Sequence, residues 1–318
     1  MMNESVARVA QEREYIGNSR CSIARTMDLV GDRWTILVLR EAYFRVRRFE
    51  EFQQNLKIAR NILTCRLKHL VLNGIFERVQ YLDRPRRFEY HFTEKGLDLY
   101  PTILALMVWG DRWLADLDGP PLVLRHIPCE HSLSPRITCS ECGLEIKARE
   151  VTYAKGEDNH WQKAKNLIKS RRRLYEGDPQ EQRTCSVART VELVGDRWTF
   201  LIIREAFFGV RRFEQFQNHL DIARNILTDR LQRLVAHDIF YRSRYQQRPE
   251  RFEYRLTEKG LDLYPVALTL MNWGDRWLTE EDTPPLLLRH KRCRHEFRPM
   301  LTCNSCGGEV KAREVRFR

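Results

Sequence analysis

Residues 21–154 of this chain recur at residues 185–318 with a constant offset of 164 positions and without a gap. About 84 of the 134 aligned positions are identical, so the chain contains two copies of one segment, here called copy one (21–154) and copy two (185–318). Core packing does not explain all of these identities, because polar residues such as Arg60 and Asn61 recur as Arg224 and Asn225. We therefore expect both copies to keep the same surface chemistry.

Length and charge limit the class of protein. A chain of 318 residues is long enough for about two domains, each able to bury a core. The net charge of +12 indicates a polyanion as partner, although a basic soluble protein without one is the plainer alternative. No run of eighteen apolar residues occurs and the N-terminus is polar, so we expect a cytoplasmic, nucleoid-associated protein with no membrane partner. The nine cysteines are then thiols or metal ligands rather than disulfides.

The apolar spacing within copy one predicts a succession of short helices. Residues 21–30, 33–44, 47–56 and 59–74 each carry an apolar stripe of helical period, and the last two form a helix-turn-helix. Residues 75–82 and 86–92 alternate in polarity around a turn at Pro85, which is typical of a β-hairpin. A helix-turn-helix followed by a hairpin is a winged helix. Thr93 then caps a long helix that extends to about Asp116 and is apolar enough for an interface, with a core helix within one domain as the alternative.

The predicted fold class is mainly α with small β wings (α+β). It consists of two winged helix-turn-helix domains that form an intramolecular pseudo-dimer, each followed by a small Cys/His-rich, zinc-ribbon-like module. The expected boundaries are 1–118 and 185–282 for the winged helices, 119–154 and 283–318 for the modules, and 155–184 for the linker. We expect a helix at about 158–175 within that linker and a further one at 4–15.

The order of these motifs resembles the HxlR-type winged helix-turn-helix transcriptional regulators of bacteria. The resemblance rests on GDRWTILVLRE, RRFEEFQQNL, ILTCRLKHLVLNGIFER, RRFEYHFTEKG and the terminal WGDRW, and it covers about residues 21–115 and 185–279. Members of that family are usually single-domain proteins that dimerise through terminal helices, so the resemblance implies DNA binding as a two-fold unit. This chain departs from the pattern because it carries two copies.

A recognition helix presents polar side chains to the major groove while its apolar stripe holds the domain together. The predicted contacts are Arg60, Asn61, Thr64 and Lys68 in copy one, and Arg224, Asn225, Thr228 and Gln232 in copy two. Asp229 replaces Cys65 and Gln232 replaces Lys68, so the face of copy two is less basic. We therefore predict an asymmetric inverted-repeat site, with ordinary exposed helix residues as the alternative.

The hairpin turns supply a second set of candidate contacts. These are Arg84, Arg86 and Arg87 in copy one, and Arg248 and Arg251 in copy two. In a wing such arginines lie on phosphates or in a narrow minor groove. A solvated turn is the alternative.

A cysteine and histidine cluster follows each winged helix. The candidate metal ligands are His126, Cys129, His131, Cys139 and Cys142 in copy one, and His290, Cys293, His295, Cys303 and Cys306 in copy two. Tetrahedral zinc takes four such donors, so five compete for four places in each copy, and His131 ranks slightly ahead of His126. We predict up to two structural zinc ions per chain, with a dithiol switch or a metal-free tail as alternatives.

Two further features invite a role. The resemblance implies that Cys21 and Cys185, each just before a first helix, sense oxidants or electrophiles, whereas a small buried residue at a helix start is the alternative. The tetrad GDRW at 31, 110, 195 and 274 is interpreted as architecture, with the Asp and Arg in a cap or ion pair and the Trp in an interface.

The leading functional hypothesis is a sequence-specific DNA-binding transcriptional regulator that is not an enzyme. A redox- or metal-responsive DNA-binding sensor, switching through Cys21 and Cys185 or the Cys-x-x-Cys pairs, is the main alternative. A zinc or thiol enzyme is disfavoured because the chain has no His-Glu-x-x-His, phosphate loop or Gly-x-Ser-x-Gly. The expected partner is double-stranded DNA, with pairing of the two copies, a further homodimer as an open alternative, and no indicated effector.

Overall fold

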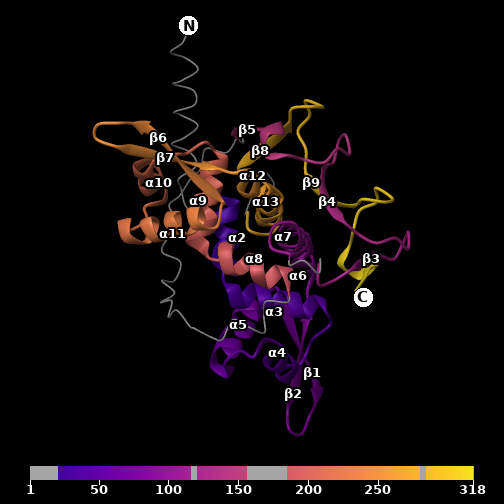
Figure 1. Cartoon of the computed structure of the whole chain (residues 1–318). Coiled ribbons are helices and arrows are strands. Elements are labelled where there is room, and N and C mark those ends of the chain that lie inside the picture. Colours follow the sequence, from indigo (N-terminus) through magenta and orange to yellow (C-terminus); the bar gives the residue numbers. More distant parts are fainter. Residues whose placement is uncertain (1–20, 116–119, 156–184, 280–283, 318) are drawn as a thin grey trace. The chain divides into compact units, whose positions relative to one another are not determined.

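The computed structural model describes residues 21–115, 120–155, 185–279 and 284–317 (Figure 1). The helices expected at 4–15 and 158–175 lie outside the described residues, as does nearly all of the linker. Helices dominate the described part, and its sheets are small and two-stranded, which confirms the expected mainly α class with small β elements. A search of the described residues for a helix of membrane-spanning length and apolarity finds none.

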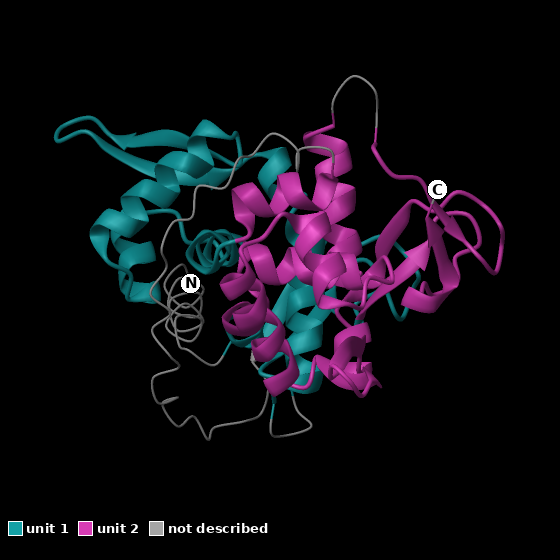
Figure 2. Cartoon of the chain, turned by 90° about the horizontal axis from the view of Figure 1, so that it is seen from below, with its two compact units in different colours: residues 1–26, 139–169, 196–298 teal, residues 27–138, 170–195, 299–318 magenta. Residues whose placement is uncertain are grey.

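The chain divides into two compact units, and each unit draws residues from both copies (Figure 2). Unit 1 comprises residues 1–26, 139–169 and 196–298, and unit 2 comprises residues 27–138, 170–195 and 299–318. The winged helix of copy one therefore belongs to unit 2, and that of copy two belongs to unit 1. The domain boundaries expected from the repeat stay a prediction, because the units group residues by contact and not by copy.

The winged helix of copy one contains three helices and a hairpin. They are α3 (Arg33–Tyr43), α4 (Phe49–Leu56), α5 (Arg60–Leu72), β1 (Phe76–Leu82) and β2 (Arg87–Phe92). Asp32 caps α3 by accepting hydrogen bonds from the backbone nitrogens of Trp34 (3.1 Å) and Thr35 (3.2 Å). β1 and β2 pair in antiparallel fashion from Phe76 opposite Phe92, with a bulge near the turn.

Copy two repeats this arrangement in unit 1. Its elements are α9 (Arg197–Phe207), α10 (Phe213–Leu220), α11 (Arg224–Ala236), β6 (Phe240–Gln246) and β7 (Arg251–Leu256). Asp196 caps α9 as Asp32 caps α3. The hairpin has the same register, from Phe240 opposite Leu256, with a bulge at the equivalent position. The predicted helix-turn-helix and hairpin are therefore present in both copies.

The long helix expected from Thr93 to Asp116 is divided in the structure. Thr93 does cap a helix, by accepting from the Gly96 nitrogen (3.2 Å), but that helix is the short α6 (Glu94–Leu97). α7 (Tyr100–Trp113) follows, with Pro101 in its first turn. Proline lacks an N–H and its ring collides with the carbonyl four residues earlier, so a helix can begin at this residue but cannot run through it. Copy two has the same break between α12 (Glu258–Leu261) and α13 (Tyr264–Trp277).

In unit 2, the first helix of copy two, α8 (Ser186–Val194), packs against α7 and α3 of copy one. Thr190 Oγ1 donates to the Leu106 carbonyl at 2.9 Å, and the Ser186 hydroxyl donates to Asp111. A Cβ on Gly110 would lie 2.5 Å from the Ser186 carbonyl oxygen, so the close approach requires glycine at this position.

Unit 1 contains the equivalent arrangement with the copies exchanged, in which the first residues of α2 (Ser22–Val30) contact α13. Thr26 Oγ1 donates to the Leu270 carbonyl at 3.0 Å, Ser22 donates to Asp275, and a Cβ on Gly274 would lie 2.5 Å from the Ser22 carbonyl. The second GDRW of each copy is thus a packing site for the first helix of the other copy, in agreement with its interpretation as architecture. Its tryptophans, Trp113 and Trp277, are only half-buried, contrary to the expectation that they fill an interface.

The segments after the winged helices form short strands that pair between copies. The strands are β3 (Leu124–His126), β4 (Pro135–Cys139), β5 (Val151–Lys155), β8 (Leu286–His290), β9 (Pro299–Cys303) and β10 (Val315–Phe317). In unit 2, β3 pairs with β10 in antiparallel fashion, and in unit 1, β5 pairs with β8. β4 pairs with β9. Each small sheet in this part of the chain therefore combines one strand from each copy.

Candidate nucleic-acid interface and metal centres

The recognition helices α5 and α11 each bury a leucine stripe and expose a polar face. Leu63, Leu67 and Leu70 are at most 1% exposed, as are the equivalent leucines of α11. All thirteen predicted DNA contacts, on the two helices and the two wings, are exposed. The structure therefore places every one of these residues where a nucleic acid can reach it.

A phenylalanine ring lies beside the first arginine of each recognition helix, a contact that sequence reasoning missed. The Arg60 guanidinium lies 5.1 Å from the centroid of the Phe49 ring, and Arg224 lies 5.4 Å from that of Phe213. The signal was present in the sequence, because a half-buried phenylalanine begins the preceding helix in both copies. A contact of this kind restricts the arginine side chain beside the first turn of the recognition helix.

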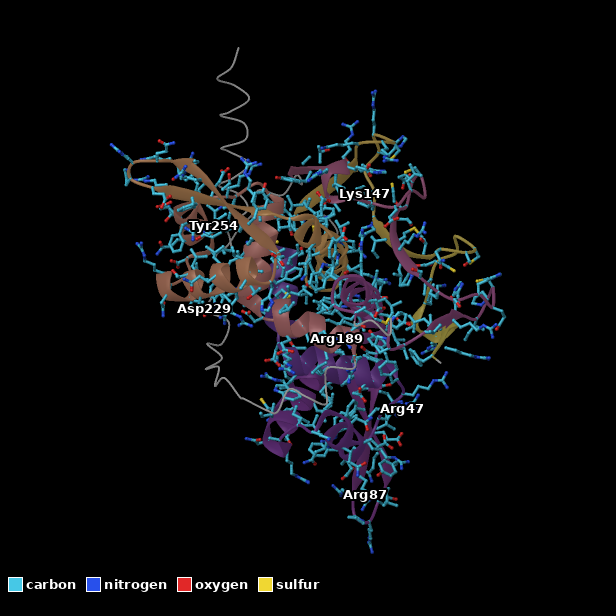
Figure 3. The ribbon with its side chains drawn as sticks, in the orientation of Figure 1. Arg47, Arg87, Lys147, Arg189, Asp229 and Tyr254 are labelled. Atoms are coloured by element: carbon cyan, nitrogen blue, oxygen red, sulfur yellow. The ribbon has the colours of Figure 1, made fainter. Side chains whose placement is uncertain are left out.

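The two recognition faces differ in charge, as the sequence predicted. Cys65 is exposed in copy one, whereas Asp229 in copy two forms an ion pair with Arg230. Arg230 also lies 3.1 Å from Asp196, so one guanidinium serves the helix cap and the recognition face. Figure 3 labels Asp229 on α11. An acidic group on this face repels phosphate unless it accepts from a cytosine amino group.

The wings differ in the same direction. Arg84, Arg86 and Arg87 are all exposed on the copy-one wing, where Figure 3 labels Arg87. In copy two, Glu250 occupies the position of Arg86, and its carboxylate lies 3.4 Å from Arg244. Copy two therefore has an acid on its wing as well as on its recognition helix, a second asymmetry that the sequence comparison had not singled out.

Two groups of cysteine and histidine side chains converge in the described residues. Centre A lies in unit 2 and consists of His126, Cys129, Cys303 and Cys306. Centre B lies in unit 1 and consists of Cys139, Cys142, His290 and Cys293. In each centre the four ligand atoms lie within 4.8 Å of one another, so each group has the donors and the proximity to hold a metal ion.

The distances in centre A match tetrahedral coordination. His126 Nδ1 lies 3.4 Å from Cys129 Sγ and 3.5 Å from Cys306 Sγ, and the Cys129 and Cys303 sulfurs are 3.9 Å apart. Bonds of about 2.3 Å to sulfur and about 2.0 Å to nitrogen place tetrahedral donors roughly 3.5–3.8 Å apart. Donor set and spacing therefore fit a zinc ion.

Centre B has nearly the same dimensions. His290 Nδ1 lies 3.3 Å from Cys142 Sγ and 3.6 Å from Cys293 Sγ, and the Cys139 and Cys293 sulfurs are 3.9 Å apart. The Nε2 atoms of His290 and His126 are buried and have no hydrogen-bond partner among the described residues. Each imidazole therefore contacts the sulfurs of its centre through Nδ1.

The centres correct two expectations. The predicted ligand sets lay within one copy, whereas each observed set takes His and Cys from one copy and a Cys-x-x-Cys pair from the other. The histidine within each group is His126, where His131 was favoured, and His290, where the equivalent residue was His295. His126 ends the buried strand β3, while the chain turns back at Glu130, where φ is +58°, and leaves the His131 side chain exposed.

Backbone groups around the centres favour thiolate at one sulfur of each coupled pair. The pKa of Cys293 is lowered to about 6, and the largest cause is a hydrogen bond from the His295 backbone. Burial raises the pKa of its neighbour Cys139 to about 11. The two sulfurs are 3.9 Å apart, close enough for the charge on one to affect the pKa of the other. A cation in the centre would instead keep all the thiols ionised.

The candidate sensing cysteines each contact an arginine, which is buried in one case (Arg204) and half-buried in the other (Arg40). Cys21 contacts Arg204 in unit 1, and Cys185 contacts Arg40 in unit 2. Burial lowers the pKa of the Arg204 guanidinium, but Glu205 and the Cys21 thiol more than offset this and raise it. Sequence reasoning missed these arginines and the paired glutamates, although Glu41 was conspicuous as an acid on the apolar stripe of its helix.

The buried Arg–Glu pair has a different third partner in each copy. In copy one, Asn55 Nδ2 donates to Glu41 Oε2 at 2.7 Å. In copy two, His219 Nδ1 lies 3.0 Å from Glu205 Oε2. Burial raises the pKa of Glu205, but Arg204 and His219 together lower it below its ordinary value.

Comparison with known proteins identifies the class of protein that this fold and these helices define. The chain belongs to the HxlR-like helix-turn-helix family, whose model matches residues 29–118 and 193–282, more than half of the chain.

Relatives match a stretch about as long as one copy. An uncharacterized HTH-type transcriptional regulator of Mycobacterium tuberculosis strain H37Rv is 50% identical over 135 residues, covering 42% of this chain and 85% of the relative. Another from Synechocystis is 35% identical over 105 residues, covering 33% of this chain and 78% of the relative. A solved Pseudomonas aeruginosa candidate transcription factor is 36% identical, covers 39% of this chain and 84% of its own, and has a TM-score of 0.31. The chain is a tandem duplication within its family.

Proposed function

We propose that this chain is a sequence-specific, DNA-binding transcriptional regulator and not an enzyme. The observation that carries the proposal is that α5 and α11 both bury their leucines and expose Arg, Asn and Thr beside an exposed arginine-bearing wing. A helix of this kind reads base edges in the major groove while the wing contacts the backbone. Family membership, the net charge of +12 and relatives named as transcriptional regulators support the proposal.

The two winged helices act as a covalent pseudo-dimer on one double-stranded site. Two-fold helix-turn-helix pairs read half-sites about 34 Å apart, one turn of DNA. Copy one presents Lys68 and Arg86 where copy two presents Gln232 and Glu250, so the half-sites have unequal sequences and unequal affinities. The protein acts in the cytoplasm on the nucleoid, and a further homodimer is the alternative assembly.

Selection of bound DNA from a random pool tests this proposal. The expected product is an imperfect inverted repeat whose half-sites lie about one turn apart. Selection with the double variant Arg224→Ala, Asn225→Ala should keep the half-site read by copy one and randomise the other. Recovery of no enriched sequence, with binding that depends on salt alone, would reject sequence-specific reading.

We also propose that centres A and B each hold a structural zinc ion. Three thiolates and one imidazole fill a tetrahedral shell and leave no open position for substrate, which is the pattern of a structural and not a catalytic site. Elemental analysis of the purified protein should find about two zinc ions per chain. Fewer than one would remove the assignment.

A redox-responsive regulator is the second candidate function, favoured by the contacts of Cys21 with Arg204 and of Cys185 with Arg40. Reactive cysteines in proteins commonly lie beside cationic side chains. DNA footprinting with and without oxidant, repeated on Cys21→Ser and Cys185→Ser, separates the two candidates. A footprint that oxidant leaves unchanged in the unmodified protein would reject the sensor and leave the regulator intact.

A further inference from the structure

Each metal centre joins a His and Cys pair of one copy to a Cys-x-x-Cys pair of the other. Centre A takes His126 and Cys129 from copy one, and Cys303 and Cys306 from copy two. Centre B takes Cys139 and Cys142 from copy one, and its other two ligands from copy two. A metal ion bound to either centre is therefore bound to both copies at once.

The surrounding backbone is crossed in the same way. Val315 of β10 lies opposite His126 of β3, and Val151 of β5 lies opposite His290 of β8. Beside these strands, the Ile127 nitrogen donates to the Glu314 carbonyl at 2.8 Å in unit 2. The equivalent bond in unit 1 runs from Lys291 to Glu150, also at 2.8 Å. Both ligand histidines therefore sit at the junction between strands of different copies.

These crossed sheets are too small to be stable on their own, although helices of the two copies also pack on one another. β3 and β10 have three residues each, and β5 and β8 have five. Two-stranded sheets of this length are marginal in water, and small modules of this kind need a disulfide or a metal to persist. The cysteines in the described residues form no disulfide, so the two centres are the available cross-links.

We propose that zinc in centres A and B is a clamp between the two copies, and that the clamp, added to the covalent linker, holds the copies in one pairing. Zinc in a site within one copy would stabilise that copy alone. Zinc in a crossed site links the two copies through its ligands. Its loss therefore removes the link between the segment after one winged helix (120–155) and the equivalent segment of the other copy (284–317). The inference rests on the zinc assignment made above, and it is independent of DNA binding.

Zinc counts in two double variants distinguish crossed sites from sites within a copy. Cys129→Ser with Cys306→Ser removes two ligands of centre A, from different copies. Cys129→Ser with Cys142→Ser removes one ligand from each centre, both in copy one. The two variants carry the same number and type of substitutions, so each is the matched control for the other.

For crossed sites, native mass spectrometry should find one zinc ion per chain in the first double variant and none in the second, against two in the unmodified chain. Sites within a copy give the reverse, none and then one. The reverse result, or equal counts in the two variants, would overturn the clamp. An unmodified chain without zinc would overturn both the clamp and the zinc assignment, while the DNA-selection result would stand.

Thiol alkylation of single variants gives a second measurement if a double variant fails to fold. With crossed sites, Cys129→Ser should make Cys303 and Cys306 react with iodoacetamide, while Cys139 and Cys142 stay protected. With sites within a copy, Cys139 and Cys142 should react instead. Protection of all four would also contradict the clamp, because a ligand would have been lost without opening either site.

Discussion

The winged helices of the two copies share one scaffold and carry different charges. α5 and α11 have the same length and bury the same three leucines, and the two hairpins have the same register. On the exposed face, however, Lys68 and Arg86 of copy one stand against Gln232 and Glu250 of copy two. Packing therefore restricts the inner face of each winged helix, whereas part of the outer face differs between the copies.

The metal centres show the opposite behaviour. All eight ligands are present, four from each copy, and the matched distances in the two centres differ by at most 0.2 Å. A metal ion bound in a centre shared by both copies would be lost if either copy lost a ligand, so a substitution here would affect both copies. The copies therefore differ on an exposed face that belongs to one copy and agree in the centres that both copies build.

The largest expected effect is that of metal removal. Chelation should lower the melting temperature by roughly 10 °C, because a ligand at a thousand times its Kd contributes about 4 kcal/mol, and each kcal/mol moves Tm by about 2–4 °C. The equivalent variants Cys142→Ser and Cys306→Ser should lower Tm by equal amounts in differential scanning calorimetry. Unequal shifts would contradict the equivalence of the two centres.

The recognition helices should instead respond unequally. Arg60→Ala with Asn61→Ala removes two side chains proposed to read bases from the more basic face. It should weaken binding to the selected site by about 3 kcal/mol, or roughly 100-fold. The matched pair Arg224→Ala with Asn225→Ala should cost roughly tenfold, because that face carries Asp229. Fluorescence anisotropy titrations measure both. Equal losses would show that the charge difference is not read.

A half-buried acid on α13, where the first residues of α2 pack, should make stability depend on pH. Burial raises the pKa of Asp275 to about 6, from an ordinary value near 3.8. A raised carboxyl pKa means that the folded state holds the proton more tightly, so this stabilisation is present below about pH 4 and is lost as the pH rises through about 6.

Asp275→Asn should therefore gain roughly 2 kcal/mol over the unmodified protein between pH 4.5 and pH 7.5, measured by urea unfolding. Loss of the proposed zinc ions at low pH would affect both proteins equally and would cancel in the difference. The stability of Asp111→Asn, at the equivalent position on α7, should change in the same direction with pH, since burial also raises the pKa of Asp111. A constant difference across this range would contradict the assignment.

The smallest expected effect is a change of charge on a wing. Glu250→Arg gives copy two the residue found at Arg86 of copy one, and should steepen the slope of log K against log salt by up to about 0.9 for one new phosphate contact. Arg86→Glu should flatten the slope by a similar amount. Titrations at several salt concentrations measure both, and an unchanged slope would place the wings away from the phosphates.

Local pattern was sufficient to predict the winged helices. Helical spacing around Leu63 and Leu67, alternation on either side of Pro85, and the cap at Thr93 all correspond to observed elements. Pro101 was a local signal for the division between α6 and α7. The continuous apolar stripe led instead to the prediction of one long helix. The buried pair of Arg204 and Glu205 was harder to predict, because charged residues on an apolar stripe become informative only when their partners from distant elements are known.

The sequence alone established the duplication, the family resemblance, the outward face of each recognition helix and the types of ligand in the modules. It could not establish which ligands meet. Both copies contain the same His, Cys and Cys-x-x-Cys series, so a set within one copy and a set drawn from both copies have the same composition and spacing. Only the pairing of β3 with β10 and of β5 with β8 decides between them, because backbone hydrogen bonds between distant strands bring the histidine of one copy to the cysteines of the other.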